Sequence, residues 1–307
     1  MRRSSYWFLT LSICGVLSVP VGAIALTISP PLIELALEPG GEYSRTIRVY
    51  NEGTVSVRVH PEVLEVVGTE SGEPSFVTPV DFDSTSVTEW IGRPATFELG
   101  AGEWVEVPFT IKVPPEAAPG TVAAAVLFTS IPLEEGGAVT VFGRTGPIVL
   151  VTVQGEIEAA GRIIEFVPVG PALGRGLYDA VPQSFLVRIE NTGSIVLVPQ
   201  GTITIANMFG AAVATMGVNN DGRRALPQWT RSFEETRAGE LPENGFLREW
   251  RAFGLGRYHA TVTVQIGEAA HQENITFWVV PWRTMSLAAA GLLTLVLAGR
   301  ARRKLSL

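Results

Sequence analysis

A nine-residue phrase occurs twice in this chain and restricts the folds that the chain can adopt. The first copy, residues 47–55, reads IRVYNEGTV, and the second, residues 187–195, reads VRIENTGSI. Each copy alternates apolar and polar residues, breaks at Asn-x-Gly and resumes with β-branched residues, which predicts strand, tight turn and strand. Asn and Gly tolerate the positive φ of such a turn. Because Asn51 and Asn191 stand 140 residues apart (191 − 51), we expect two similar modules in tandem.

The remainder of the chain also reads as short strands and turns. Residues 104–113 and 256–266 alternate cleanly between apolar and polar side chains, which indicates half-buried strands. Gly (32) and Pro (21) are abundant, as expected where many strands are joined by turns. The only cysteine is Cys14, so no disulfide can hold the fold. About seven or eight strands in each module predict an all-β chain of two tandem immunoglobulin-like β-sandwiches, residues 26–154 and 155–280.

Three stretches interrupt the strand pattern. Residues 68–90 are polar and rich in Ser, Thr and Pro, and we expect a long loop outside the sandwich, with Trp90 packed where the chain rejoins it. Residues 226–233 read as a bulged strand, and residues 234–249 are polar and predict a loop.

The N-terminus has the features of a secretory signal peptide. Arg2 and Arg3 precede an apolar run, and Ala23-Ile24-Ala25 has the small-residue form of a cleavage site. We therefore expect residues 1–25 to be removed; the alternative is an uncleaved anchor. A lipoprotein signal is disfavoured because Cys14 lies inside the apolar run and follows Ile13.

The C-terminus predicts one membrane-spanning helix over residues 282–299. A spanning helix needs ~20 apolar residues, and this run reaches the lower end of that range. Trp278 and Trp282 stand at its start, and a basic cytoplasmic tail, residues 300–307, follows, as the positive-inside rule expects. A cell-wall sorting signal also has a hydrophobic tail with basic residues after it, but the pentapeptide at residues 241–245 is too far from the tail and reads as a loop.

The sequence offers no convergent catalytic set. The three histidines, His60, His259 and His271, have no metal-ligand spacing, and no nucleophile elbow, phosphate loop or calcium loop is present. The net charge of −7 argues against nucleic acid as a partner. We expect a protein that is not an enzyme and uses no cofactor and no metal.

Tryptophans are the candidate interaction residues. Trp104, Trp229 and Trp250 lie in the predicted ectodomain, where Trp serves either as a core residue or, when exposed, as an interface or sugar-stacking residue. Both possibilities stay open for each of the three.

Several of these motifs resemble a known family. The opening I-x-P-P-x-x-E-L-x-L-x-P-G at 28–40, the I-x-V-x-N-x-G at 47–53 and the V-P-P-x-A-x-P-G-T at 113–121 resemble the first domain of the bacterial WxL-interacting protein family. The resemblance implies a signal peptide, tandem immunoglobulin-like domains, a membrane helix and a basic tail. It also implies a first domain that binds peptidoglycan and a second that binds a protein. The shared positions are structural, so no binding residue can be transferred, and the polar stretch near residues 68–91 departs from the family.

Two hypotheses follow. The first is a single-pass bacterial membrane protein, with its ectodomain extracellular or periplasmic and its C-terminus cytoplasmic, that binds cell-wall polymer or partner surface proteins through its immunoglobulin-like domains. The second rests on a more distant similarity to periplasmic pilus chaperones, which lack a C-terminal membrane helix. In that alternative the module binds secreted subunits by strand addition.

Overall fold

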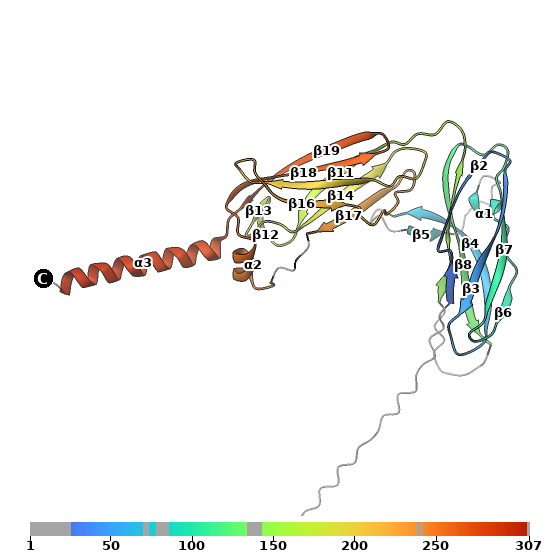
Figure 1. Ribbon diagram of the computed structural model, residues 1–307, viewed down its shortest axis with the longest axis horizontal. Helices are drawn as coiled ribbons and strands as arrows, with labels where there is room; N and C mark the ends of the chain where they lie inside the picture. The colour runs from blue at the N-terminus through green and yellow to red at the C-terminus, as the bar shows by residue number, and fades with distance from the viewer. Residues whose placement is uncertain are drawn as a thin grey trace, which may run out of the picture.

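The computed structural model describes residues 26–69, 74–77, 86–133, 143–237, 239 and 242–305. The predicted signal peptide, residues 1–25, lies outside these residues, and so does a strand that the sequence predicts at residues 138–142. The described chain is mostly β-structure and ends in one long helix (Figure 1). Its strands form four sheets, two from residues before Gln154 and two from residues after it, so we describe a first and a second half.

The first half contains two sheets and one short helix. One sheet has the order β1-β3-β7, and the other has the order β2-β10-β8-β4-β5, with β6 on β4 and β9 on β8. The elements are β1 (Leu26–Ser29), β2 (Leu32–Leu37), β3 (Glu42–Asn51), β4 (Val57–Gly68), β5 (Pro74–Val77), α1 (Val87–Trp90), β6 (Phe97–Leu99), β7 (Trp104–Lys112), β8 (Gly120–Pro132), β9 (Arg144–Thr145) and β10 (Ile148–Val153).

The second half is built in the same way. Its sheets have the orders β11-β14-β17 and β12-β13-β19-β18-β15-β16. The elements are β11 (Gly161–Val169), β12 (Ala172–Gly174), β13 (Leu177–Tyr178), β14 (Ser184–Asn191), β15 (Gln200–Ala206), β16 (Ala212–Val218), β17 (Thr230–Thr236), α2 (Gly245–Arg251), β18 (Gly256–Ile266) and β19 (Ala269–Val279), followed by α3 (Trp282–Leu305).

The two halves repeat one topology. In each, an early strand pairs in parallel with the last strand of the larger sheet: β2 with β10, and β13 with β19. The other strand pairs in both halves are antiparallel. The chain leaves the smaller sheet after the first strand of each half and returns to it at β3 or β14, so a strand from the start of each half lies beside the last strand of the larger sheet.

Each half has its own hydrophobic core, and alternation along the strands supplies it. β18 shows the principle: Tyr258, Ala260, Val262, Val264 and Ile266 are buried, while the residues between them are not. Successive side chains of a strand point to opposite faces, so one face of β18 fills the core. In the first half both sheets contribute, through residues such as Ile47, Val107, Val126 and Val151.

The duplicated Asn-x-Gly phrase forms a turn in both halves, but the turn does not close a hairpin. β3 and β4 belong to different sheets, as do β14 and β15, so each turn carries the chain across the core. A strand precedes the break at both copies as expected, but the positive φ expected in the turn is wrong, because neither the Asn nor the Gly of either copy has one. Local alternation identifies a strand and a break, but it cannot say with which sheet the next strand pairs.

Buried asparagine side chains hold these crossings. Asn191 is fully buried, its Nδ2 donates to the carbonyls of Ile195 (2.8 Å) and Ala225 (2.9 Å), and its Oδ1 accepts from the Gly193 amide (3.0 Å). Asn51 is equally buried and bonds to the matching positions, Val55 and Gly53. Because a buried amide needs partners for both its donors and its acceptor, this side chain fixes the turn and ties it to a third segment.

Two of the predicted irregular stretches contain regular structure. The described part of residues 68–90 holds β5 and α1, and Trp90 is buried as expected. The loop expected over 234–249 is wrong at both ends, because β17 continues to Thr236 and α2 begins at Gly245. Asn244 caps α2 by accepting from the amides of Phe246 and Leu247, which allows a helix too short to show apolar periodicity.

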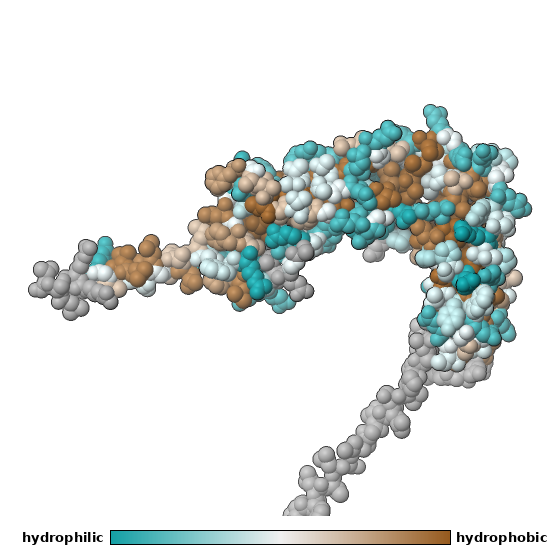
Figure 2. Space-filling view, viewed as in Figure 1, coloured by the Kyte–Doolittle hydropathy of each residue, from teal (hydrophilic) through white to brown (hydrophobic). Residues whose placement is uncertain are grey.

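The two halves meet in a separate apolar cluster. Residues of β4, β8 and β10 in the first half contact Leu226, Val196 and Trp229 of the second. A Cβ on Gly68 would lie 2.3 Å from the Trp229 ring, so the ring packs directly on that glycine. The Thr121 amide donates to the Ser194 carbonyl, and Arg224 pairs with Glu34. Figure 2 shows brown surface near this junction, where the chain bends.

α3 leaves the far end of the second half. The stretch Trp282–Arg300 is long and apolar enough to cross a membrane, and none of it is buried within the described structure. Figure 1 shows α3 projecting away from the second half, with α2 near its start. The helix is therefore not a buried amphipathic helix of the core.

Candidate functional site

The outer strand β16 is the candidate interaction site. It reads AVATMGV, pairs only with β15, and contains neither a charged residue nor a proline. Met216 and Val218 point into the core, while Ala212, Val213 and Thr215 are exposed, Val213 by 43%. An outer strand presents one row of unpaired N–H and C=O groups, to which another chain can add a strand.

The other described outer strands carry features that discourage such pairing. β7 contains Pro108 and is partly covered where Gly92 donates to the Thr110 carbonyl. β11 has a proline, two charges and a register shift, and β17 has three charges. β2 carries Glu34, and β1, β5 and β12 have four residues or fewer. Charges, prolines, bulges and shortness are the usual protections of a sheet edge, so β16 stands out among the described edges.

One end of β16 is closed. The backbone N–H of Asn219, just after the strand, donates to the Glu235 carboxylate on β17 at 2.8 Å. The accessible edge therefore extends from Ala212 toward Met216, at the end of the strand that lies nearer α3.

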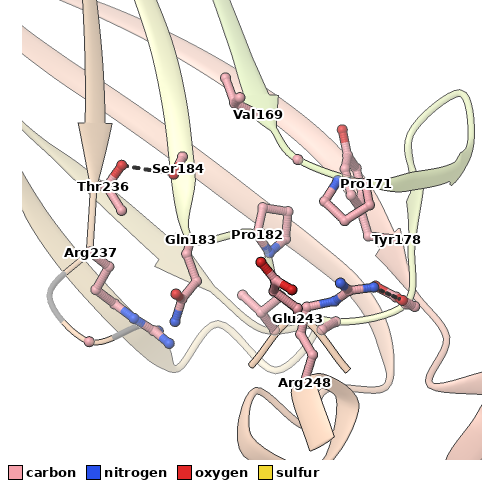
Figure 3. Close-up of a pocket in the computed structure, with 15 residues that line it drawn as sticks. Val169, Pro171, Tyr178, Pro182, Gln183, Ser184, Thr236, Arg237, Glu243 and Arg248 are labelled. Atoms are coloured by element: carbon pink, nitrogen blue, oxygen red, sulfur yellow. Dashed lines mark hydrogen bonds and ion pairs between the residues drawn. The ribbon is translucent and has the colours of Figure 1, made fainter. Parts of the chain in front are cut away.

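A hollow of about 750 Å³ lies between the end of the β11-β14-β17 sheet and α2 (Figure 3). Tyr178, Gln183, Arg237, Glu243 and Arg248 are among its lining residues. Burial raises the pKa of Tyr178, so the phenol stays neutral at physiological pH. The described lining contains no histidine and no cysteine, and Ser184 bonds to Thr236 (2.8 Å), which leaves no activated nucleophile.

A buried charged cluster lies beneath this hollow and joins α2 to α3. The Asp179 carboxylate accepts from Arg248 (2.5 Å) and from Arg283 (2.8 Å). Burial alone would raise the pKa of Asp179, but the hydrogen bonds and charges of the two arginines outweigh it and lower that pKa. Asp179 is therefore ionised in the folded protein at neutral pH, as a buried ion pair requires.

Glu249 binds the first turn of α3. Its fully buried carboxylate accepts from the Thr284 amide (2.8 Å), the Thr284 hydroxyl (3.0 Å) and the Arg283 guanidinium (3.1 Å). The first N–H groups of a helix lack partners within the helix and carry partial positive charge. A carboxylate from α2 satisfies them, so α3 begins at a fixed position and angle on the second half.

The structure places the three predicted tryptophans in different surroundings. Trp104 is 56% exposed on β7, with the Arg48 guanidinium 4.6 Å from its ring centre. Trp250 is 66% exposed on α2. Trp229 is half-buried between the two halves, where it serves the internal junction. The structure does not bring the three side chains together, so an interaction role for Trp104 and Trp250 stays a prediction.

The histidines make ordinary strand contacts. His60 Nδ1 bonds to the Thr96 hydroxyl and His259 Nδ1 to that of Thr276. Among the described residues, no group of three His, Cys, Asp or Glu side chains could hold a metal ion.

Comparison with known proteins gives a fold likeness only. No family model and no curated protein matches the chain. Solved structures that resemble it include the class 5 fimbriae chaperone CfaA (TM-score 0.42, 11% identity, 84% of this chain and 100% of that chain). Others are the E. coli chaperone DraB (0.37, 12%, 83% and 98%) and the CsuC-CsuE complex of Acinetobacter baumannii (0.38, 9%, 82% and 97%). At TM-scores below 0.5, these likenesses decide neither the partner nor the function of this chain.

Proposed function

We propose that this chain is a single-pass envelope protein, not an enzyme, whose two immunoglobulin-like sandwiches stand outside the membrane and bind a secreted or surface protein by strand addition to β16. The observation that carries the proposal is the seven-residue outer strand without charge or proline. Strand addition gains affinity from main-chain hydrogen bonds and specificity from alternate side chains. The exposed Val213 and Thr215 would supply those side-chain contacts.

The membrane anchor supports a partner outside the cell. α3 is long and apolar enough over Trp282–Arg300 to cross a membrane and packs against the protein only at its start, which is the expected form of a lipid-embedded helix. The predicted signal peptide would place residues 26–281 extracellularly or in the periplasm, with the basic tail in the cytoplasm. A secreted chain that is not yet folded has free strands to pair with such an edge.

Cell-wall polymer is the alternative ligand. Sugar binding favours exposed aromatic faces, and Trp104 offers one, but Arg48 already stands over that ring. Among the described residues, the aromatic pairs lie within the cores. The geometry therefore favours a protein partner.

Photo-crosslinking in living cells tests the proposal. A photoreactive amino acid at position 213 or 215 should capture a secreted protein, and mass spectrometry should map the junction to an extended segment of that partner. The same probe at position 104, on β7, whose edge is interrupted by Pro108 and partly covered, is the control. Equal capture at all positions would contradict strand addition, and capture of wall polymer at position 104 alone would favour the alternative.

A charge on the edge gives a second test. We expect Val213→Lys together with Thr215→Lys to lower capture at least tenfold, because lysine on an outer strand is a common natural block to pairing. Both side chains are exposed, so thermal unfolding should change little. Undiminished capture by the double variant would place the binding site elsewhere.

A further inference from the structure

We infer that the end of the second half nearest α3 rests on the lipid surface through a ring of exposed apolar side chains. The apolar collar, as we name it, consists of Met208, Phe209, Leu247, Trp250, Phe253 and Leu255, which are between 48% and 87% exposed. This inference relies on the proposed membrane anchoring by α3 and adds a second contact with the same membrane.

The collar residues come from segments that the fold gathers at one end. Leu247 and Trp250 are on α2, whose Glu249 binds the start of α3. Phe253 and Leu255 follow in the connection to β18, whose first residue, Gly256, lies opposite Val279 at the end of β19. Figure 2 shows brown surface at this end of the second half, beside the start of α3.

The tip between β15 and β16 reaches the same end. β15 ends at Ala206, opposite His259, and the chain continues toward the start of β18. A Cβ on Gly256 would lie 2.6 Å from the Met208 methyl carbon, so Met208 lies against the start of β18. Phe209, beside it, is 87% exposed, the most exposed large apolar side chain in the described structure. A phenylalanine at that exposure is unfavourable in water unless something covers it.

The length of α3 brings this end to the membrane. The candidate span, Trp282–Arg300, has 19 residues, and at ~1.5 Å per residue it is about 28 Å long. The hydrocarbon core of a bilayer is ~30 Å thick, so the helix must enter lipid at about Trp282. Only Val280 and Pro281 separate β19 from α3, and Val280 still donates to the Tyr178 carbonyl. The folded domain therefore begins where the lipid headgroups are.

Polar groups at this end suit the headgroup region. Asp179 and Glu249 neutralise Arg248 and Arg283. Arg251 and Arg257 are exposed and make no ion pair within the described part of the chain. Exposed arginine next to Trp, Phe and Leu is the composition of surfaces that lie in the interface of anionic membranes. The occupant is thus lipid, with its headgroups at the arginines and its upper acyl chains at the collar.

Spin-label accessibility on the full chain tests the inference. The protein, in a Cys14→Ser background, is placed in nanodiscs of phosphatidylcholine and phosphatidylglycerol that contain no other membrane protein. Labels are introduced by Phe209→Cys, Trp250→Cys, Leu293→Cys in α3, and Ile157→Cys, an exposed position near the other end of the second half. We expect labels at 209 and 250 to show a severalfold higher ratio of oxygen to nickel-chelate accessibility than the label at 157.

The outcomes separate the inference from the proposed function. A lipid-like label at 293 with water-like labels at 209 and 250 would overturn the collar and leave the anchor intact. A water-like label at 293 would overturn both. As a second measurement, Phe209→Ser with Trp250→Ser should increase the motion of the label at 157, because the membrane no longer steadies the domain; unchanged motion would contradict the docking.

Discussion

Replacing Asn191 should destabilise the second half by more than its small volume implies. The side chain is fully buried and makes three hydrogen bonds of 2.8 to 3.0 Å to backbone groups. Asn191→Ala leaves two carbonyls and one N–H without those partners. A hydrogen bond contributes about 1 kcal/mol net, and an unsatisfied buried group costs about 1–3 kcal/mol, so we expect a loss of about 3–5 kcal/mol.

The loss is measurable as a fall in melting temperature. For a unit of this size, 1 kcal/mol corresponds to about 4 °C, which predicts a fall of roughly 12–20 °C. Differential scanning calorimetry and near-ultraviolet circular dichroism of the full chain in detergent would record it. Asn191→Asp should be at least as damaging, because it loses both donated bonds and turns a charge toward two carbonyl oxygens.

An exposed asparagine provides the control. Asn220 is exposed and makes no side-chain hydrogen bond within the described structure, so Asn220→Ala should change stability by no more than ~0.5 kcal/mol. If Asn191→Ala also cost less than about 1 kcal/mol, the turn would be held by its backbone alone, and our account of the buried amide would be refuted.

Three further perturbations test other contacts. Folding lowers the pKa of Asp179, so the ionised carboxylate stabilises the fold fully above its ordinary pKa of 3.8, and this stability is lost as pH falls through the lower folded value. Asp179→Asn should therefore flatten the acid side of a plot of melting temperature against pH. An unchanged slope would contradict this account. Glu249→Ala should speed amide hydrogen exchange at Thr284 by more than tenfold. Unaltered exchange would show that the first turn of α3 is stable without the Glu249 carboxylate. Gly68→Ala should destabilise the junction by about 1–3 kcal/mol through its clash with Trp229, and Trp229→Ala in the same chain should relieve part of the loss in a double-mutant cycle.

Much of the strand content follows from local sequence, because alternation and turn residues are local signals. β7 and β18 are strands as predicted. The long apolar run at the C-terminus predicts α3 in the same direct way. Which sheet a strand joins is a different question, since it depends on contacts between distant residues. Local sequence therefore does not predict that the chain crosses between sheets at each Asn-x-Gly phrase.

The candidate sites could not be predicted from the sequence alone, because they depend on how the fold places distant residues. The composition of β16 is plain in the sequence, but its place at an edge is a property of the sheet order. Asp179, Glu249 and Arg283 are separated by 70 and 34 residues, so no spacing rule connects them (249 − 179 and 283 − 249). α2 had one local signal, Asn244 followed by Gly245 and an apolar pair, which fits a capped helix start.

The parallel pairing of β2 with β10 and of β13 with β19 also sets how the protein bears load. If the chain is pulled at Leu26 while α3 holds the membrane, β2 and β10 are drawn in opposite directions along their parallel ladder, and so are β13 and β19. All bonds of such a ladder are strained together instead of one after another. β2 has 6 residues to share that strain, whereas β13 has 2, so in a single-molecule pulling experiment we expect the membrane-proximal half to yield at the lower force.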